Sequence, residues 1–122
     1  MRPIGSVAII GAGNMGSGIA QKSAQEQFDV QMVDREEQWV ERGQSIIANF
    51  LDEAIERQIF RETEAEQIKA RITGVVGTEN VAKDTDLVIE AVFEDFDIKT
   101  AVFATLDEVC DEHTILASIS LI

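Results

Sequence analysis

Residues 7–21, VAIIGAGNMGSGIAQ, decide the fold of this chain. A short apolar run leads directly into glycines spaced G-x-G-x-x-G, and a helix-forming run follows. In a strand–turn–helix unit, Gly11 permits the tight turn and Gly13 lets a pyrophosphate approach the backbone, while Gly16 lets the helix pack closely on the strand. The stretch therefore predicts a βα unit whose helix N-terminus offers free N–H groups and a positive dipole end to phosphates.

The end of the next apolar run strengthens this prediction. Asp34 closes the second predicted strand, where a carboxylate can accept hydrogen bonds from the adenosine ribose hydroxyls. A βα turn without a ligand is the alternative, and the context of the glycines makes us prefer a dinucleotide site. The loop residues that we expect to bind the cofactor are Gly11, Ala12, Gly13, Asn14, Met15 and Gly16.

Asp34 also predicts which dinucleotide is bound. Its carboxylate would repel the 2′-phosphate of NADP, which favours NAD. The neighbouring Arg35 argues the other way, since a cation there can accept that phosphate. Because the carboxylate is still present, we expect NAD as the cofactor, with Asp34 and Arg35 both in the site.

Short apolar runs alternate with helical runs along the whole chain, and each run reads as one element. Strands that are nearly all apolar and alternate with helices indicate a parallel sheet covered on both faces. We expect an α/β fold, a Rossmann-like doubly wound parallel sheet of about five strands. The predicted strands are residues 6–10, 29–33, 72–77, 86–92 and 114–118, and the predicted helices are residues 14–27, 36–60, 62–71 and 95–110.

Length and composition predict one cytoplasmic domain over residues 1–122. Of its residues, 45% are hydrophobic, which suffices for one modest core. The apolar runs are too short for a membrane span, and MRPIGSVAII lacks the apolar region of a secretory signal. The single cysteine, Cys110, cannot form an internal disulfide, which fits a reducing compartment.

The charge balance is strongly acidic. The formal net charge is −13, from 23 acidic and 10 basic residues, which argues against nucleic acid and membrane surfaces as partners. The acids are spread along the chain, and the lysines are only Lys22, Lys69, Lys83 and Lys99. This pattern suggests adaptation to high salt, where screening removes the cost of self-repulsion. An ordinary acidic cytosolic protein is the alternative.

Several blocks of the sequence together resemble one enzyme family. GAGNMGSGIAQ, VDREE, ARITG, DLVIEAVFEDFDIKTAVFATLDE and HTILAS follow one another in the order found in the NAD-binding domain of the L-3-hydroxyacyl-CoA and 3-hydroxybutyryl-CoA dehydrogenases. The resemblance implies hydride transfer between a 3-hydroxyacyl-CoA and NAD, in fatty-acid or hydroxybutyrate metabolism. It also implies a helical substrate domain that these 122 residues do not contain.

The resemblance implies further site residues. Glu94 and Lys99 correspond to cofactor contacts of the family, and both follow the fourth predicted strand, at the edge where open α/β sheets bind ligands. A solvated helix start is the alternative for both residues. Arg57 stands where the family has a lysine that contacts coenzyme A, although Phe50 replaces the accompanying serine and cannot form its hydrogen bond.

The chain departs from the family at its end. ASISLI stands where the family has Ala-Ser-Asn-Thr-Ser-Ser, either by substitution or because four residues of that loop are absent. The catalytic His–Glu pair of the family lies beyond this segment. We therefore expect no catalytic residue here, His113 included, and no metal site. The alternative function is a stand-alone NAD-binding or regulatory module without catalytic activity.

The last predicted strand suggests self-association. Nothing that follows residues 114–118 in this chain would cover the outer edge of that strand. An open strand edge beside apolar surface is a template for pairing with another chain, so we expect a homo-oligomer.

The acidic, lysine-poor composition predicts stability that depends on salt. The melting temperature should rise substantially as potassium chloride is added up to molar concentrations, because screening weakens repulsion within a chain of net charge −13. Thermal denaturation monitored by circular dichroism would measure it. A flat or falling profile would identify an ordinary acidic protein.

Overall fold

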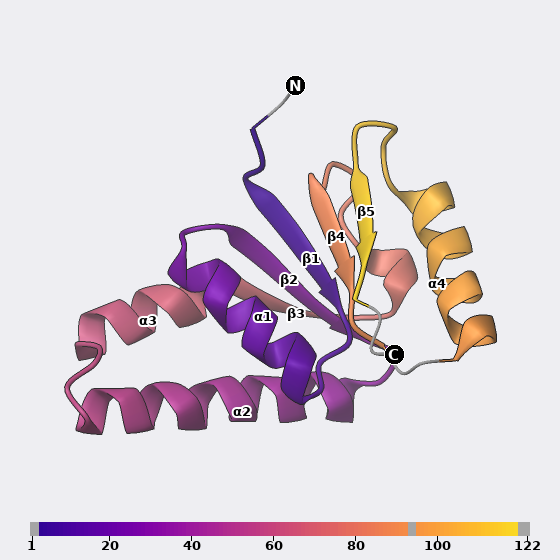
Figure 1. Ribbon diagram of the computed structural model, residues 1–122. Helices are drawn as coiled ribbons and strands as arrows, with labels where there is room; N and C mark the ends of the chain where they lie inside the picture. The colour runs from indigo at the N-terminus through magenta and orange to yellow at the C-terminus, as the bar shows by residue number, and fades with distance from the viewer. Residues whose placement is uncertain (1–2, 93–94, 120–122) are drawn as a thin grey trace.

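Five parallel strands form one sheet in the order β3-β2-β1-β4-β5, with helices on both faces (Figure 1). This computed structural model describes residues 3–92 and 95–119. It confirms the predicted doubly wound α/β fold. In chain order the elements are β1 (Ser6–Ile10), α1 (Asn14–Gln25), β2 (Asp29–Asp34), α2 (Glu37–Glu56), α3 (Glu62–Ala70), β3 (Ile72–Val76), the short 3₁₀ helix η1 (Thr78–Asn80), β4 (Leu87–Glu90), α4 (Phe96–Val109) and β5 (Ile115–Ser118).

The central strand β1 divides the core into two layers. Val7 and Ile9 belong to the cluster under α1, α2 and α3, whereas Ala8 and Ile10 belong to the cluster that α4 covers. Successive side chains of a strand point to opposite faces, so a strand in the middle of the sheet must be apolar at every position. All four of these residues are at most 3% exposed.

Two helices end earlier than the sequence predicts, and the cause is the same for both. Gln27 after α1 and Gln58 after α2 have positive φ angles of 73° and 61°. After α2, the Ile59 N–H donates to the Ala54 carbonyl at 2.8 Å, the bond that closes a Schellman motif. Glycine is the usual residue at this position, so a glutamine there does not mark a helix end in the sequence.

The strand register brings the predicted site to one edge of the sheet. Ile10, the last residue of β1, pairs with Val33 of β2 on one side and with Glu90 of β4 on the other. From β1 the chain adds β2 and then β3 on one side of β1, and it then crosses to the other side of β1 to add β4 and β5. The carboxyl ends of β1 and β4 therefore flank a topological switch point, the position where open α/β sheets bind their ligands.

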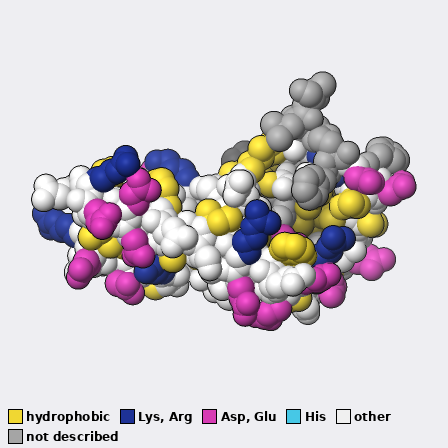
Figure 2. Space-filling model, turned by 90° about the horizontal axis from the view of Figure 1, so that it is seen from below, with side chains coloured by type: hydrophobic (Ala, Val, Ile, Leu, Met, Phe, Trp, Pro, Cys, Tyr) yellow, Lys and Arg dark blue, Asp and Glu magenta, His cyan; other side chains and the backbone are white. Residues whose placement is uncertain are grey.

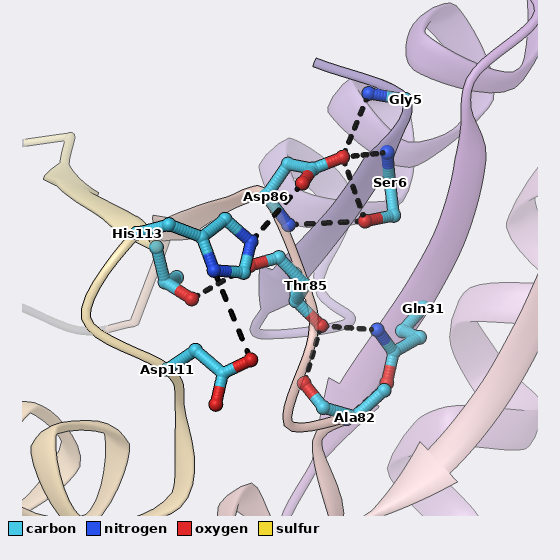
Figure 3. Close-up of polar contacts among 9 residues, drawn as sticks. Gly5, Ser6, Gln31, Ala82, Thr85, Asp86, Asp111 and His113 are labelled. Atoms are coloured by element: carbon cyan, nitrogen blue, oxygen red, sulfur yellow. Dashed lines mark hydrogen bonds and ion pairs between the residues drawn. The ribbon is translucent and has the colours of Figure 1, made fainter. Parts of the chain in front are cut away.

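The opposite, amino edge of the sheet is held by a polar cluster around Asp86 (Figure 3). The Asp86 carboxylate accepts hydrogen bonds from the Gly5 N–H at 2.9 Å, the Ser6 N–H at 3.1 Å and the Ser6 hydroxyl at 3.2 Å. His113 Nε2 lies 3.2 Å from the other carboxylate oxygen. These contacts join the starts of β1 and β4 to the loop before β5. His113 thus lies at the far edge of the sheet from the glycine loop.

The Asp86 cluster predicts a specific dependence of stability on pH. Hydrogen bonds from the Gly5 and Ser6 backbone lower the pKa of Asp86 from 3.8 to about 2. The folded state therefore binds fewer protons than the unfolded state between these values, and the stabilisation by Asp86 is complete above about pH 4 and lost as the pH falls toward 2.

Urea unfolding of the unaltered chain and of Asp86→Asn, from pH 7 to pH 2.5, would measure this dependence. We expect Asp86→Asn to unfold at lower urea at pH 7, with a difference that narrows below pH 4. Asp84→Asn, which alters an exposed neighbouring carboxylate, is the matched control. A difference that does not change with pH would contradict the assignment.

Candidate functional site

The three glycines of the loop meet three different constraints. Gly11 has a φ of +115°, and a Cβ there would lie 2.7 Å from the Ala91 carbonyl oxygen. A Cβ on Gly16 would overlap the Gly11 carbonyl oxygen, because α1 begins directly against the turn. At Gly13, a Cβ would meet nothing within 4 Å. Backbone strain and packing thus require glycine at the first and last positions, whereas Gly13 leaves open space beside the backbone.

The N-terminus of α1 faces this open space with its N–H groups uncapped. Gly13 is the N-cap residue, no side chain caps the helix, and its first turn contains no acidic residue. Asn14 and Met15 are exposed in that first turn. An uncapped helix N-terminus whose first turn holds no carboxylate retains its positive dipole end and its unpaired donors, which suit an anion.

Ser17 stabilises the loop from within and was not among the predicted site residues. Its side chain is completely buried, and its hydroxyl donates to the Gly13 carbonyl at 2.7 Å. The sequence signal is a serine that directly follows the last glycine of the motif. The signal is not specific, because serine in a helix also often faces solvent.

Asp34 lies against the glycine loop, as its position in the sequence predicted. One carboxylate oxygen accepts the Ala12 N–H at 3.0 Å, and the other accepts the Arg35 N–H at 2.7 Å. These two bonds set the orientation of the carboxylate and leave each oxygen with a second lone pair. The Arg35 side chain belongs to an exposed residue directly after β2.

Lys99 is held by the buried Glu90 carboxylate in a partly exposed cluster at the ends of β4 and β5. Its ammonium lies 3.1 Å from a Glu90 carboxylate oxygen, and the side chains of the pair are 15% and 0% exposed, respectively. The Ser118 hydroxyl donates to the same Glu90 oxygen at 2.8 Å. Lys99 is therefore not the solvated residue of an ordinary helix start. Glu94, the other residue predicted here, lies outside the described residues.

Glu90 is the residue of this edge that sequence reasoning missed. It stands in DLVIEAV, where the pattern indicates a buried strand, and its charge carried no specific prediction. A single carboxylate at the end of an otherwise apolar strand is the available signal, because a buried charge requires partners.

Arg57 is not brought to this edge. It caps the far end of α2, about 30 Å from the start of that helix by the rise per residue, and it forms an exposed ion pair with Glu53 at 2.6 Å. Phe50, which lies on the same helix, is 52% exposed. The structure therefore separates Arg57 from the glycine loop and Asp34.

The surface around the site is mixed in charge. Figure 2 views the molecule from the side toward which the strands point, and acidic side chains are spread over it with Lys and Arg among them. Residues 3–92 and 95–119 contain no group of three or more His, Cys, Asp or Glu side chains placed to hold a metal ion. Within the same residues, no helix combines the length and the apolar character of a membrane span.

Comparisons with known proteins agree with the resemblance drawn from the motifs. Residues 6–120 match the family described as "3-hydroxyacyl-CoA dehydrogenase, NAD binding domain". A probable 3-hydroxybutyryl-CoA dehydrogenase from Bacillus subtilis is 40% identical over 115 residues, which are 94% of this chain and 40% of that protein. A peroxisomal fatty acid beta-oxidation multifunctional protein from rice is 35% identical over 96% of this chain and 16% of its own length.

A solved structure gives the same result in three dimensions. The (S)-3-hydroxybutyryl-CoA dehydrogenase from Ralstonia eutropha superposes with a TM-score of 0.90 at 37% identity, covering 95% of this chain and 41% of that one. The chain thus spans less than half the length of these relatives. With an uncapped helix N-terminus beside Asp34 and a family match over nearly all of its residues, the chain belongs to the NAD-binding domain family of the 3-hydroxyacyl-CoA dehydrogenases.

Proposed function

We propose that this chain is the cofactor-binding part of an enzyme that transfers a hydride between a 3-hydroxyacyl-CoA and NAD. The contact between the Asp34 carboxylate and the Ala12 N–H carries the proposal, because it joins a ribose-binding group to a phosphate-binding loop. The family match supports the acyl-CoA class of substrate. The stand-alone module is the less favoured hypothesis, since the matched relatives are dehydrogenases and a beta-oxidation protein.

The glycine loop and α1 fit the pyrophosphate of NAD. The open space at Gly13 lets a phosphate approach the backbone, and the uncapped first turn at Asn14 and Met15 offers N–H donors. Gly11 and Gly16 would act indirectly, by holding the turn and the helix in position. An anion at this point would also be stabilised by the helix dipole.

Asp34 fits the adenosine ribose. Its two backbone hydrogen bonds hold the carboxylate at the carboxyl end of β2, beside the loop. The remaining lone pairs can accept the ribose hydroxyls, and the negative charge would repel a 2′-phosphate. Arg35 is exposed and would contribute weakly to cofactor choice.

The second half of the dinucleotide would lie over β4 and β5. When bound, NAD supplies the acceptor of the hydride. Lys99 would line this half from the first turn of α4, and the family resemblance adds Glu94. A catalytic base would come from residues beyond this segment, because His113 is held by Asp86 at the amino edge of the sheet.

Arg57 is the one residue of this chain that the family resemblance assigns to coenzyme A. Arg57 offers a cation for a phosphate of coenzyme A, but its guanidinium is engaged by Glu53. Phe50 provides apolar surface where the family has a hydroxyl. We therefore propose that most substrate contacts lie outside these residues, and that Arg57 contributes little to acyl-CoA affinity.

Cofactor choice is testable at Asp34. The unaltered chain should bind NADH at least about tenfold more tightly than NADPH, a difference of about 1.4 kcal/mol. Asp34→Asn should reduce this preference by removing the charge while keeping an oxygen for the Ala12 N–H, whereas Asp34→Ala should also weaken NADH binding by releasing the loop. Fluorescence titration would measure the affinities for NADH and NADPH of the unaltered chain and of each Asp34 variant. Arg35→Ala is the control for the neighbouring cation. Equal affinities of the unaltered chain would contradict the assignment.

The 122-residue chain should bind NADH without turning over substrate. Turnover needs a base near the substrate hydroxyl and a pocket that holds the reacting carbon close to the nicotinamide. His113 lies at the wrong edge of the sheet to serve as that base. The absorbance of NADH would be followed with acetoacetyl-CoA at high protein concentration, beside a binding titration. Turnover above the protein-free control that disappears in His113→Ala would overturn the placement of the base.

A further inference from the structure

The Glu90 carboxylate is completely buried at the carboxyl end of β4, and three segments of the chain meet on it. One oxygen accepts the Val92 N–H at 2.8 Å, and the other accepts the Ser118 hydroxyl at 2.8 Å. The Lys99 ammonium lies 3.1 Å from that second oxygen. Glu90 thus connects the end of β5 and the first turn of α4 to the end of β4.

This cluster is a costly way to stabilise a sheet. Full burial removes the Glu90 carboxylate from water and the Lys99 side chain is largely withdrawn from it, and a well-packed apolar pair at such a position is often as stable or more stable. The buried strand residues nearest to Glu90, Val88 on the same strand and Ile10 paired with it on β1, are apolar. A role in fixing geometry explains the charge better than a role in stability alone.

The position of the cluster indicates what geometry is fixed. Ala91 follows Glu90 directly. A Cβ on Gly11 would lie only 2.7 Å from the Ala91 carbonyl oxygen, so the end of β4 lies against the glycine turn. Lys99 also lies 3.4 Å from the Ser118 hydroxyl and 3.5 Å from the Ile119 carbonyl oxygen. The cluster therefore forms the wall of the switch point on the side of β1 opposite to Asp34.

A dinucleotide crosses this switch point with one nucleoside on each side. The half of the sheet that contains β2 carries Asp34 and takes the adenosine, and the pyrophosphate lies at the start of α1. The second nucleoside must then lie over the ends of β4 and β5, beside Lys99 and Ser118. At this wall the Lys99 ammonium can donate to a ribose or carboxamide oxygen, and the Ser118 oxygen, whose hydrogen is donated to Glu90, can accept a hydrogen bond.

We propose that Glu90 is a positioning residue for the nicotinamide nucleoside. Its buried carboxylate holds the Lys99 ammonium and the end of β5, at Ser118, in the arrangement that this half of the dinucleotide contacts. Glu90 itself is buried under these groups and touches no ligand. This inference rests on the proposed binding of NAD and adds a residue to it.

Glu90→Gln tests the proposal, with NADH and ADP as the two probes. ADP shares the adenosine and the phosphates of NADH but lacks the second nucleoside. The variant retains a side-chain oxygen for the Ser118 hydroxyl or the Val92 N–H but loses the ion pair with Lys99. Isothermal titration calorimetry should show NADH affinity lowered about tenfold, the scale of one hydrogen bond to a charged group, while ADP affinity changes less than about twofold.

The ratio of the two affinities separates positioning from a purely structural role. Partial unfolding lowers the apparent affinity for both probes equally and leaves their ratio unchanged. Asp86→Asn is the matched control, because it also removes a carboxylate charge that joins β1, β4 and the β5 side of the sheet, but at the amino edge. It should leave the ratio of NADH to ADP affinity at the value of the unaltered chain.

The Ser118→Ala variant extends the test, since it keeps Glu90 and Lys99 and removes one hydrogen bond. It should lower NADH affinity less than Glu90→Gln does, with ADP affinity again unchanged, and it replaces Glu90→Gln if that variant fails to fold. The positioning role would be overturned if the ratio of NADH to ADP affinity were unchanged in both Glu90→Gln and Ser118→Ala. It would also be overturned if Asp86→Asn changed this ratio equally. Failure of the unaltered chain to bind either probe would instead contradict the proposed function itself.

Discussion

The turn between β1 and α1 is the constraint on which the rest of the site depends. Gly11 must adopt a φ of +115° against the Ala91 carbonyl, and α1 must start so close to the turn that Gly16 touches the Gly11 carbonyl oxygen. Any side chain at either position would push α1 away from the sheet or separate β1 from the end of β4. The close approach directs the first turn of α1 over the carboxyl edge, and from this follow the open space at Gly13 and the contact between Asp34 and the loop.

Two carboxylates flank this turn and act in different ways. Asp34 at the end of β2 is partly exposed and keeps acceptor capacity beside the loop, whereas Glu90 at the end of β4 is fully buried and engages Val92, Ser118 and Lys99. The first carboxylate can therefore contact a ligand, and the second can act only through the groups that it holds. Their separation by β1 matches the two halves of a dinucleotide that crosses the switch point.

The two edges of the sheet carry different sets of polar contacts. At the amino edge, Asp86 joins the starts of β1 and β4 through backbone hydrogen bonds and contacts His113. Those bonds lower the pKa of Asp86 to about 2. A histidine in contact with a carboxylate is a common arrangement in catalytic sites, but this pair lies at the edge of the sheet away from the glycine loop. Location in the fold, and not residue type, decides its role.

Much of this protein is determined by local sequence. Central strands of a parallel sheet must be apolar on both faces, so runs such as Val7–Ile10 can be recognised as strands in the sequence. The alternation of these runs with amphipathic helices specifies the fold class. The spacing of the glycines and the position of Asp34 predict the cofactor loop, because a turn, a close approach and a helix N-terminus are properties of consecutive residues. The tertiary structure decided the rest. Glutamines with positive φ end α1 and α2. Lys99, for which a solvated helix start was the alternative to a cofactor contact, is held by Glu90. Such outcomes depend on which residues distant in the chain meet when β4, α4 and β5 pack together, and a buried ion pair forms only when packing supplies both partners.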